Sequence, residues 1–120
     1  MAEKLHYIQM KGNPVFKHAV KRMGEAAEQA LAKAGIAKED ISWLIPHQAN
    51  IRIIDATGAR LKLPKEKTFV NIQKYGNVSV ATIPLGLHEL IQDGKLKKGE
   101  ILVMDAFGAG FTWGAIVYRW

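Results

Sequence analysis

The longest predicted helix lies in the first third of the chain. From residue 15 to residue 34, apolar side chains recur every three or four positions, as they do on the buried face of an amphipathic helix. Asn13 is a favourable N-cap, and Pro14 suits the first helical position, where its missing N–H goes unused. Gly35 is a typical residue just beyond a helix C-terminus. We predict one helix over this segment.

Two further helices are predicted downstream. The first covers residues 51–61 and ends before Pro64, and the second covers residues 80–91 and is ended by Gly94. Pro84 falls early in the second of these helices, where backbone N–H groups have no helical partner and a proline is tolerated.

Short apolar or alternating runs between the helices predict strands. A continuous apolar run such as residues 41–45 is typical of a strand buried on both faces of a parallel sheet. The element order is then β-α-β-α-β-α-β-β, which predicts an α/β fold of three layers, α-β-α, with a mixed five-stranded sheet ending in a hairpin. The predicted strands are residues 5–10, 41–45, 67–72, 99–107 and 111–120.

The composition fits one domain over residues 1–120. Of the 120 residues 48% are apolar, which is enough for a core. No apolar run approaches the ~20 residues of a membrane span, and the N-terminus lacks the apolar segment of a secretory signal. There is no cysteine, so this sequence offers no disulfide, thiolate ligand or cysteine nucleophile. We expect a cytoplasmic protein without a membrane partner.

The net charge of +6 favours acidic partners. Nucleic acid, coenzyme A and an acidic carrier protein all carry the required negative charge. The basic residues are dispersed, however, and neither zinc-finger spacing nor an aromatic RNA-binding motif accompanies them. A nucleic-acid binder is therefore the last of these hypotheses, and a steep salt dependence of DNA affinity would be needed to support it.

Polar or glycine-rich segments follow three of the predicted strands. His47 follows the second strand, Asn77 lies in the turn after the third, and the glycine turn 107–110 follows the fourth. Functional loops of open α/β sheets gather at the carboxyl ends of strands, so these segments can converge. Sequence alone does not show that they meet.

Each of these segments also has a purely structural interpretation. A lone histidine is most often a satisfied helix-start residue, and both Asn77 and the glycine segment are ordinary turn chemistry. Functionally, the imidazole of His47 could donate from Nε2, or act as a general acid or base near a reference pKa of about 6.5. The Asn77 amide could donate to a developing oxyanion. A metal site is not supported, because His47 has no ligand partner at i+4.

Taken together, the motifs resemble a known family. In order along the chain they are YIQMKGNPVFKHAV, WLIPHQANIRII, YGNVSVATIPLGL and GEILVMDAFGAGFTWGAIVYRW. This set resembles the C-terminal half of β-ketoacyl-acyl-carrier-protein synthase III, the initiating condensing enzyme of type II fatty-acid synthesis. The resemblance covers essentially the whole chain and implies a thiolase-like fold.

The resemblance also implies an acyltransferase chemistry. The family works with a Cys-His-Asn set whose cysteine belongs to the N-terminal half, and the matching positions here are His47 and Asn77. The backbone N–H of Ala109 would face an oxyanion during acyl transfer. The substrates would be acyl-CoA and malonyl-acyl-carrier protein, with no further cofactor. Without the thiol, the isolated chain is expected to be inactive in condensation.

The same resemblance implies partners and two binding surfaces. The partners would be the acyl-carrier protein, the N-terminal half and a second copy in a homodimer. The carrier protein would meet a short cationic segment through its acidic helix. That segment is Gln48, Ala49, Asn50, Ile51 and Arg52, and the pantetheine and acyl channel would be lined by Gly12, Asn13, Phe16, Ala49, Asn50 and Phe107. Helix capping by Asn13 and Asn50, and core packing by Phe16 and Phe107, are competing interpretations.

Two other hypotheses stay open. The chain could be a non-catalytic acyl-carrier or coenzyme A-binding module that kept the fold. It could also belong to a related condensing enzyme, such as a hydroxymethylglutaryl-CoA synthase or an alkylquinolone-type synthase.

Overall fold

The computed structural model describes residue 7 and residues 9–120, and its first element is the long helix α1 (Gly12–Ala34). The C-terminus is as predicted: Gly35 adopts a φ of 65°, and its N–H bonds to the carbonyl groups of the last turn. The predicted N-cap is wrong. Lys11 occupies the cap position and Asn13 lies exposed within the first turn, because Gly12 is already helical. Most of the predicted strand 5–10 lies outside the described residues, and Gln9 and Met10 belong to no strand.

A three-stranded mixed sheet forms the centre of the described structure. The strands are β1 (Ile41–Pro46), β2 (Ile101–Gly108) and β3 (Thr112–Arg119), in the order β1-β2-β3. β1 and β2 run parallel, whereas β2 and β3 pair antiparallel. The predicted C-terminal hairpin is thus confirmed.

The predicted strand over residues 67–72 is wrong, so the five-stranded sheet is not found in the described part of the chain. A single parallel bridge joins Thr68 to Leu44, and the N–H of Phe69 donates to the carbonyl of Leu44. The flanking residues form a short 3-10 turn over Lys65–Lys67 and the one-turn helix α3 (Ile72–Tyr75). The segment therefore lies beside β1, where a strand was expected, but does not pair along its length.

The side chain of Gln48 replaces part of the missing strand pairing. Its Nε2 donates to the carbonyl oxygens of Pro46 at 2.9 Å and Phe69 at 3.2 Å, and its Oε1 accepts from the N–H of Asn71 at 3.1 Å. Gln48 is fully buried. A buried amide with both ends bonded to backbone groups satisfies donors and acceptors that a ladder would otherwise have used.

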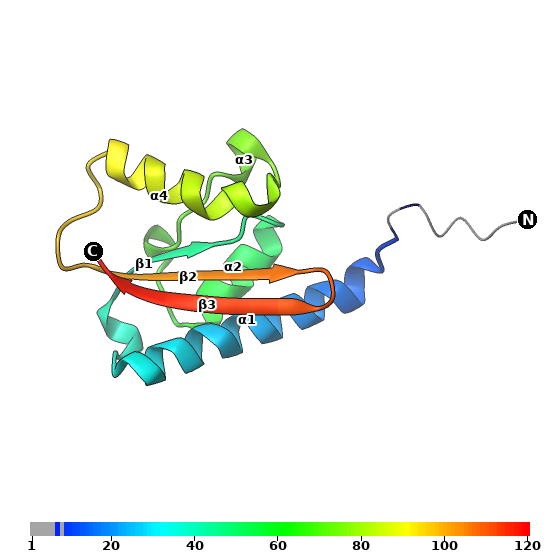
Figure 1. Cartoon of the computed structure of the whole chain (residues 1–120), viewed down its shortest axis with the longest axis horizontal. Helices are drawn as coiled ribbons and strands as arrows, with labels where there is room; N and C mark the ends of the chain where they lie inside the picture. Colours follow the sequence, from blue (N-terminus) through cyan, green and yellow to red (C-terminus); the bar gives the residue numbers. More distant parts are fainter. Residues whose placement is uncertain (1–6, 8) are drawn as a thin grey trace, which may run out of the picture.

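Helices cover both faces of the sheet, as Figure 1 shows. Neighbouring residues of a strand point to opposite faces. Leu44 and Val103 pack against α1 and against Leu61, the residue that follows α2 (Ile51–Arg60). Ile45 packs against α4 (Thr82–Gln92) on the other face. The predicted three layers are therefore confirmed, with three strands in the central one.

The starts of α2 and α4 agree with the sequence. The Asn50 side chain caps α2 by accepting from the N–H of Arg52 at 2.8 Å. Pro84 is the third residue of α4, where it removes no helical hydrogen bond. Gly86 lets α4 approach the sheet, since a Cβ there would lie 2.9 Å from Ile45.

No helix among the described residues is both long and apolar enough to cross a bilayer.

The outer strand β3 carries large apolar side chains that the described chain does not cover. Trp113, Ile116 and Tyr118 are 44%, 62% and 51% exposed, although they belong to the sheet that forms the core. Soluble surfaces rarely gather so many large apolar residues on one strand without a partner.

Candidate active site

His47 lies at the carboxyl end of β1, where the strand passes into the turn before α2. Its N–H donates to the carbonyl of Asp105 at 2.8 Å, which extends the β1–β2 pairing by one residue and fixes the backbone. The ring is half-buried, and its Nδ1 lies 2.8 Å from the hydroxyl oxygen of Thr82. Burial lowers the pKa of His47, so the ring is neutral at pH 7.

Asn77 follows α3 and is held in a tight turn. Its Oδ1 accepts from the N–H of Ser79 at 3.0 Å. Ser79 itself adopts a φ of 53°, a left-handed conformation that non-glycine residues seldom adopt. Because the amide oxygen is already bonded, the Nδ2 end of Asn77 is the one left to act on another group, and it can only donate.

Glu89 on α4 forms hydrogen bonds to α3 and to the residue before it, the segment that precedes Asn77. Its carboxylate accepts from Lys74 Nζ at 2.6 Å, from the Tyr75 hydroxyl at 2.7 Å and from Asn71 Nδ2 at 3.3 Å. Hydrogen bonds from Lys74 and Tyr75 lower the pKa of Glu89 to about 2. α3 is thus fastened to α4 at several points just before the turn that carries Asn77.

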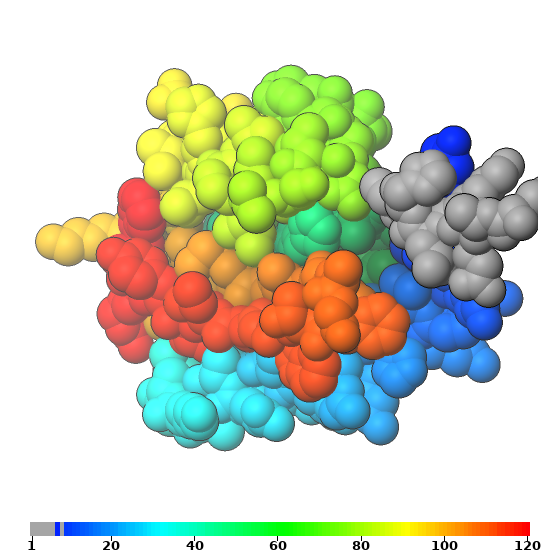
Figure 2. Space-filling view, turned by 45° about the vertical axis from the view of Figure 1, so that its right-hand side comes forward, coloured from blue at the N-terminus to red at the C-terminus, as the bar shows by residue number. Residues whose placement is uncertain are grey.

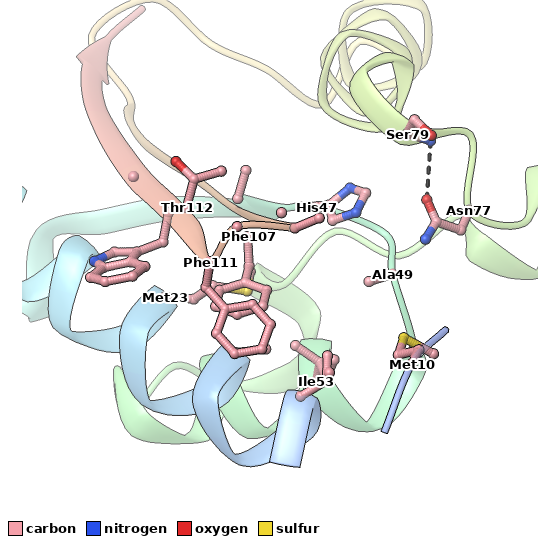
Figure 3. Close-up of a pocket in the computed structure, with 18 of the residues that line it drawn as sticks. Met10, Met23, His47, Ala49, Ile53, Asn77, Ser79, Phe107, Phe111 and Thr112 are labelled. Atoms are coloured by element: carbon pink, nitrogen blue, oxygen red, sulfur yellow. Dashed lines mark hydrogen bonds between the residues drawn. The ribbon is translucent and has the colours of Figure 1, made fainter. Parts of the chain in front are cut away.

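His47 and Asn77 line one open cavity of about 980 Å³. Figure 3 shows both polar side chains on one side of it, with the Phe107 and Phe111 rings nearer the middle of the lining. The surface view shows a hollow between the yellow-green helical region and the orange end of the hairpin (Figure 2). The segments that the sequence left free to converge thus line one cavity, although Asn77 follows the helix α3 and not a strand, and the roles of the residues stay predictions.

The wall of the cavity away from His47 is apolar. Ala19 and Met23 of α1 pack with Ile53 of α2 and with Phe107 of β2 in one cluster. The Phe107 and Phe111 rings lie 5.0 Å apart, centroid to centroid. An apolar wall with an imidazole and an amide at one end suits an elongated ligand with a polar reactive group.

The other predicted site residues divide into two groups. Ala49, Phe107 and Ala109 line the cavity with His47 and Asn77. Gly12, Asn13, Phe16 and Asn50 do not line it. Phe16 instead packs at the edge of the apolar cluster, where the guanidinium of Arg52 lies 5.0 Å above its ring.

The prediction that the Gln48 side chain contacts a carrier protein is not retained. This side chain has no exposed surface and bonds only to backbone groups of the chain itself. Its neighbours differ: Asn50, Ile51 and Arg52 are exposed at the start of α2, and Ala49 is partly buried.

Sequence reasoning missed two residues beside the site. Thr82 contacts the His47 ring, but a threonine at a helix start carries no signal for such a contact. Asp105 was detectable, because it interrupts the continuous apolar run of a buried strand. It is 1% exposed, and neither carboxylate oxygen has a hydrogen-bond partner within the described chain.

Replacing Asp105 by asparagine is expected to stabilise the folded chain at pH 8. Burial raises the pKa of the Asp105 carboxyl to about 7, whereas an unfolded aspartate titrates near ~4. The folded state therefore binds more protons between these values, and the free energy of unfolding falls as the pH rises through that window. The gain should approach ~4 kcal/mol at pH 8 and be much smaller at pH 5.

Urea unfolding of the Asp105→Asn chain at both pH values measures this effect. Asp55→Asn, at an exposed position of α2, is the matched control because it changes the net charge equally. An equal gain at pH 5 and pH 8 would contradict the assignment to the buried carboxyl.

Comparison with known proteins decides the family. Residues 31–120 match the family described as 3-oxoacyl-[acyl-carrier-protein] synthase III C terminal. The chain belongs to this family. The β-ketoacyl-[acyl-carrier-protein] synthase III of Aquifex aeolicus is 53% identical over 119 residues, which are 99% of this chain and 38% of that protein. The synthase III of Clostridioides difficile is 53% identical over 97% of this chain and 35% of that protein.

Solved structures of synthase III share the thiolase-like fold of this chain. The crystal structure of the Aquifex aeolicus enzyme matches 99% of the chain with a TM-score of 0.93, and that of the Pseudomonas aeruginosa enzyme matches 100% at 38% identity with a TM-score of 0.91. The chain covers 39% and 38% of those two proteins. It therefore spans little more than a third of the length of these synthase III relatives.

Proposed function

We propose that this chain is the C-terminal part of a β-ketoacyl-acyl-carrier-protein synthase III that condenses acyl-CoA with malonyl-acyl-carrier protein. The observation that carries the proposal is the pair His47 and Asn77. Both line one cavity, and the Asn77 amide oxygen is already bonded to Ser79, so that its nitrogen is the end left to donate.

The reaction needs donors where negative charge develops. A malonyl thioester loses CO₂ when the electron pair of the breaking C–C bond passes into an enolate on the thioester oxygen. The enolate carbon that lost CO₂ then attacks an acyl thioester on the cysteine of the N-terminal part. The new C–C bond forms, and the cysteine leaves as a thiolate. Two N–H groups directed at the enolate oxygen lower the barrier, and losing one of them typically costs ~3 kcal/mol, about a hundredfold in rate.

The electrostatics of the site support this role. Burial keeps the His47 ring neutral, and a neutral imidazole with its proton on Nε2 donates without competing for the substrate's protons. The turn containing Ala109 lies exposed on the same cavity, so its backbone N–H can serve the second oxyanion, the one formed during acyl transfer.

A second protein part would complete the enzyme. The sequence described here has no cysteine, and β3 exposes Trp113, Ile116 and Tyr118. We infer that the cysteine-bearing part covers apolar surface of this kind. For the acyl-carrier protein, the exposed start of α2 at Asn50, Ile51 and Arg52 is the proposed docking segment, because Arg52 offers a cation to an acidic helix.

A chimera tests the proposal, with this chain replacing the matching C-terminal part of the Aquifex aeolicus enzyme. The chimera is expected to form acetoacetyl-carrier protein from acetyl-CoA and malonyl-carrier protein. Asn77→Ala should lower this rate about a hundredfold, since one of the two enolate donors is lost. Gln73→Ala removes an exposed amide from α3 and is the matched control. Full activity of Asn77→Ala would overturn the role of Asn77.

An inactive chimera that still binds the carrier protein would favour the alternative, a non-catalytic carrier-binding module. In that case Arg52→Glu should weaken binding of the carrier protein, because it reverses the charge at the docking segment.

A further inference from the structure

The Thr82 hydroxyl joins α4 to the catalytic end of the sheet. Thr82 is the first residue of α4 and is 2% exposed. Its Oγ1 lies 2.8 Å from Nδ1 of His47, the ring nitrogen opposite Nε2. The proposed function places no role on this hydroxyl, although it lies within hydrogen-bond distance of the His47 ring.

The same hydroxyl has a second hydrogen-bond partner. It donates to the carbonyl oxygen of Ser79 at 3.0 Å. A hydroxyl has one proton and two lone pairs, so while it donates to Ser79 it can only accept from Nδ1–H. The neutral His47 ring then carries its proton on Nδ1, and Nε2 has a free lone pair.

The opposite arrangement leaves no backbone group unpaired. The carbonyl of Ser79 also accepts the backbone N–H of Thr82. If the hydroxyl proton turns to Nδ1, Ser79 keeps this partner, and the neutral ring carries its proton on Nε2. The heavy atoms need not move between the two directions of the Thr82 hydroxyl hydrogen bond. Neither direction leaves a buried polar group unpaired, which would cost ~1–3 kcal/mol of stability.

We propose that Thr82 is a positioning residue for His47: its hydroxyl can accept from Nδ1–H or donate to Nδ1, and so it holds the ring in one orientation in either neutral tautomer. This inference rests on the proposed function for its catalytic consequence only. A donor at the enolate requires a proton on Nε2, which for a neutral ring requires the Thr82 hydroxyl to donate.

Nitrogen-15 NMR of the chain labelled at histidine tests the contact without any assay of activity. Thr82→Val keeps the shape of the side chain but removes the hydroxyl, and it is expected to shift the His47 Nδ1 resonance. Thr82→Ser should keep the wild-type resonance. Thr57→Val is the matched control, because Thr57 is equally buried and its hydroxyl bonds only to Ile53 of its own helix. An unchanged His47 resonance in Thr82→Val would overturn the inference.

The chimera described above measures the catalytic consequence. Thr82→Val is expected to lower kcat about tenfold with little change in KM, because one hydrogen bond that orients the His47 ring is lost. Thr82→Ser keeps the hydroxyl and should keep the wild-type kcat. If Thr82→Val does not fold, Thr82→Ala and Thr82→Ser provide the same comparison.

The two measurements separate the two proposals. An inactive wild-type chimera together with a shifted resonance in Thr82→Val overturns the proposed function but leaves the contact in place. An active chimera that Thr82→Val does not slow overturns the positioning role.

Discussion

Replacing His47 by alanine is expected to lower the rate at which the chimera decarboxylates malonyl-carrier protein by a factor of about one hundred to one thousand. The substitution removes the ring whose Nε2 is the proposed donor to the enolate, whereas Asn77 stays in its turn with its amide oxygen bonded to Ser79. Release of labelled CO₂ from malonyl-carrier protein measures the decarboxylation directly. His88→Ala, at an exposed position of α4, is the matched control and should keep full activity.

Glutamine at position 47 distinguishes a donor from a general base. A glutamine side chain can place an amide N–H near the position of the imidazole Nε2, yet it cannot take up a proton near neutral pH. If His47 acts as a donor, His47→Gln should retain more decarboxylation than His47→Ala. If the ring acts as a base, both variants should lose the same activity, and that outcome would contradict the proposed role.

The pH dependence provides an independent check on His47. Burial lowers the pKa of the ring, so the imidazole is already neutral at pH 7. A neutral donor predicts a decarboxylation rate that does not decline between pH 7 and pH 8. A requirement for imidazolium predicts instead a tenfold decline per pH unit in this range.

Most of the fold could be predicted from periodicity. The apolar stripe of residues 15–34 and Gly35 predicted α1, and the continuous apolar run 41–45 predicted β1. The alternation of helices and strands predicted the three layers of the fold. The sequence indicated that His47 and Asn77 could converge but did not show that they do. Of the two, only His47 follows a strand of the observed sheet, because Asn77 follows the helix α3.

The errors arise where long-range contacts compete with local pattern. The run 67–72 has the composition of a strand, but a strand requires a continuous backbone partner. Gln48, distant in sequence, supplies side-chain partners to Phe69 and Asn71 instead. The sequence around Gln48 suggests a polar, solvent-facing helix start, so neither its burial nor its bonds to the backbone carried a local signal. The contact of Thr82 with His47 spans 35 positions and was hidden for the same reason.

Gln48→Leu is therefore expected to destabilise the chain more than any exposed substitution near the site. Leucine has a similar volume but no polar atoms, and it would leave the carbonyls of Pro46 and Phe69 and the N–H of Asn71 without this partner. Buried polar groups left unpaired cost ~1–3 kcal/mol each, so we expect a loss of ~3–5 kcal/mol in the free energy of unfolding. That is a large share of the ~5–15 kcal/mol that stabilises a typical domain.

Urea unfolding followed by circular dichroism measures this loss, and Gln73→Leu makes the same chemical change at an exposed position of α3. Gln73→Leu should change stability by less than ~0.5 kcal/mol. Gln48→Glu separates the two ends of the amide. It keeps an acceptor for the N–H of Asn71 but loses the donor to Pro46 and Phe69, and it places a charge in a buried position. It should therefore destabilise the chain as well. A Gln48→Leu chain as stable as the Gln73→Leu control would show that the segment 68–71 is held beside β1 by apolar packing, with no contribution from the buried amide.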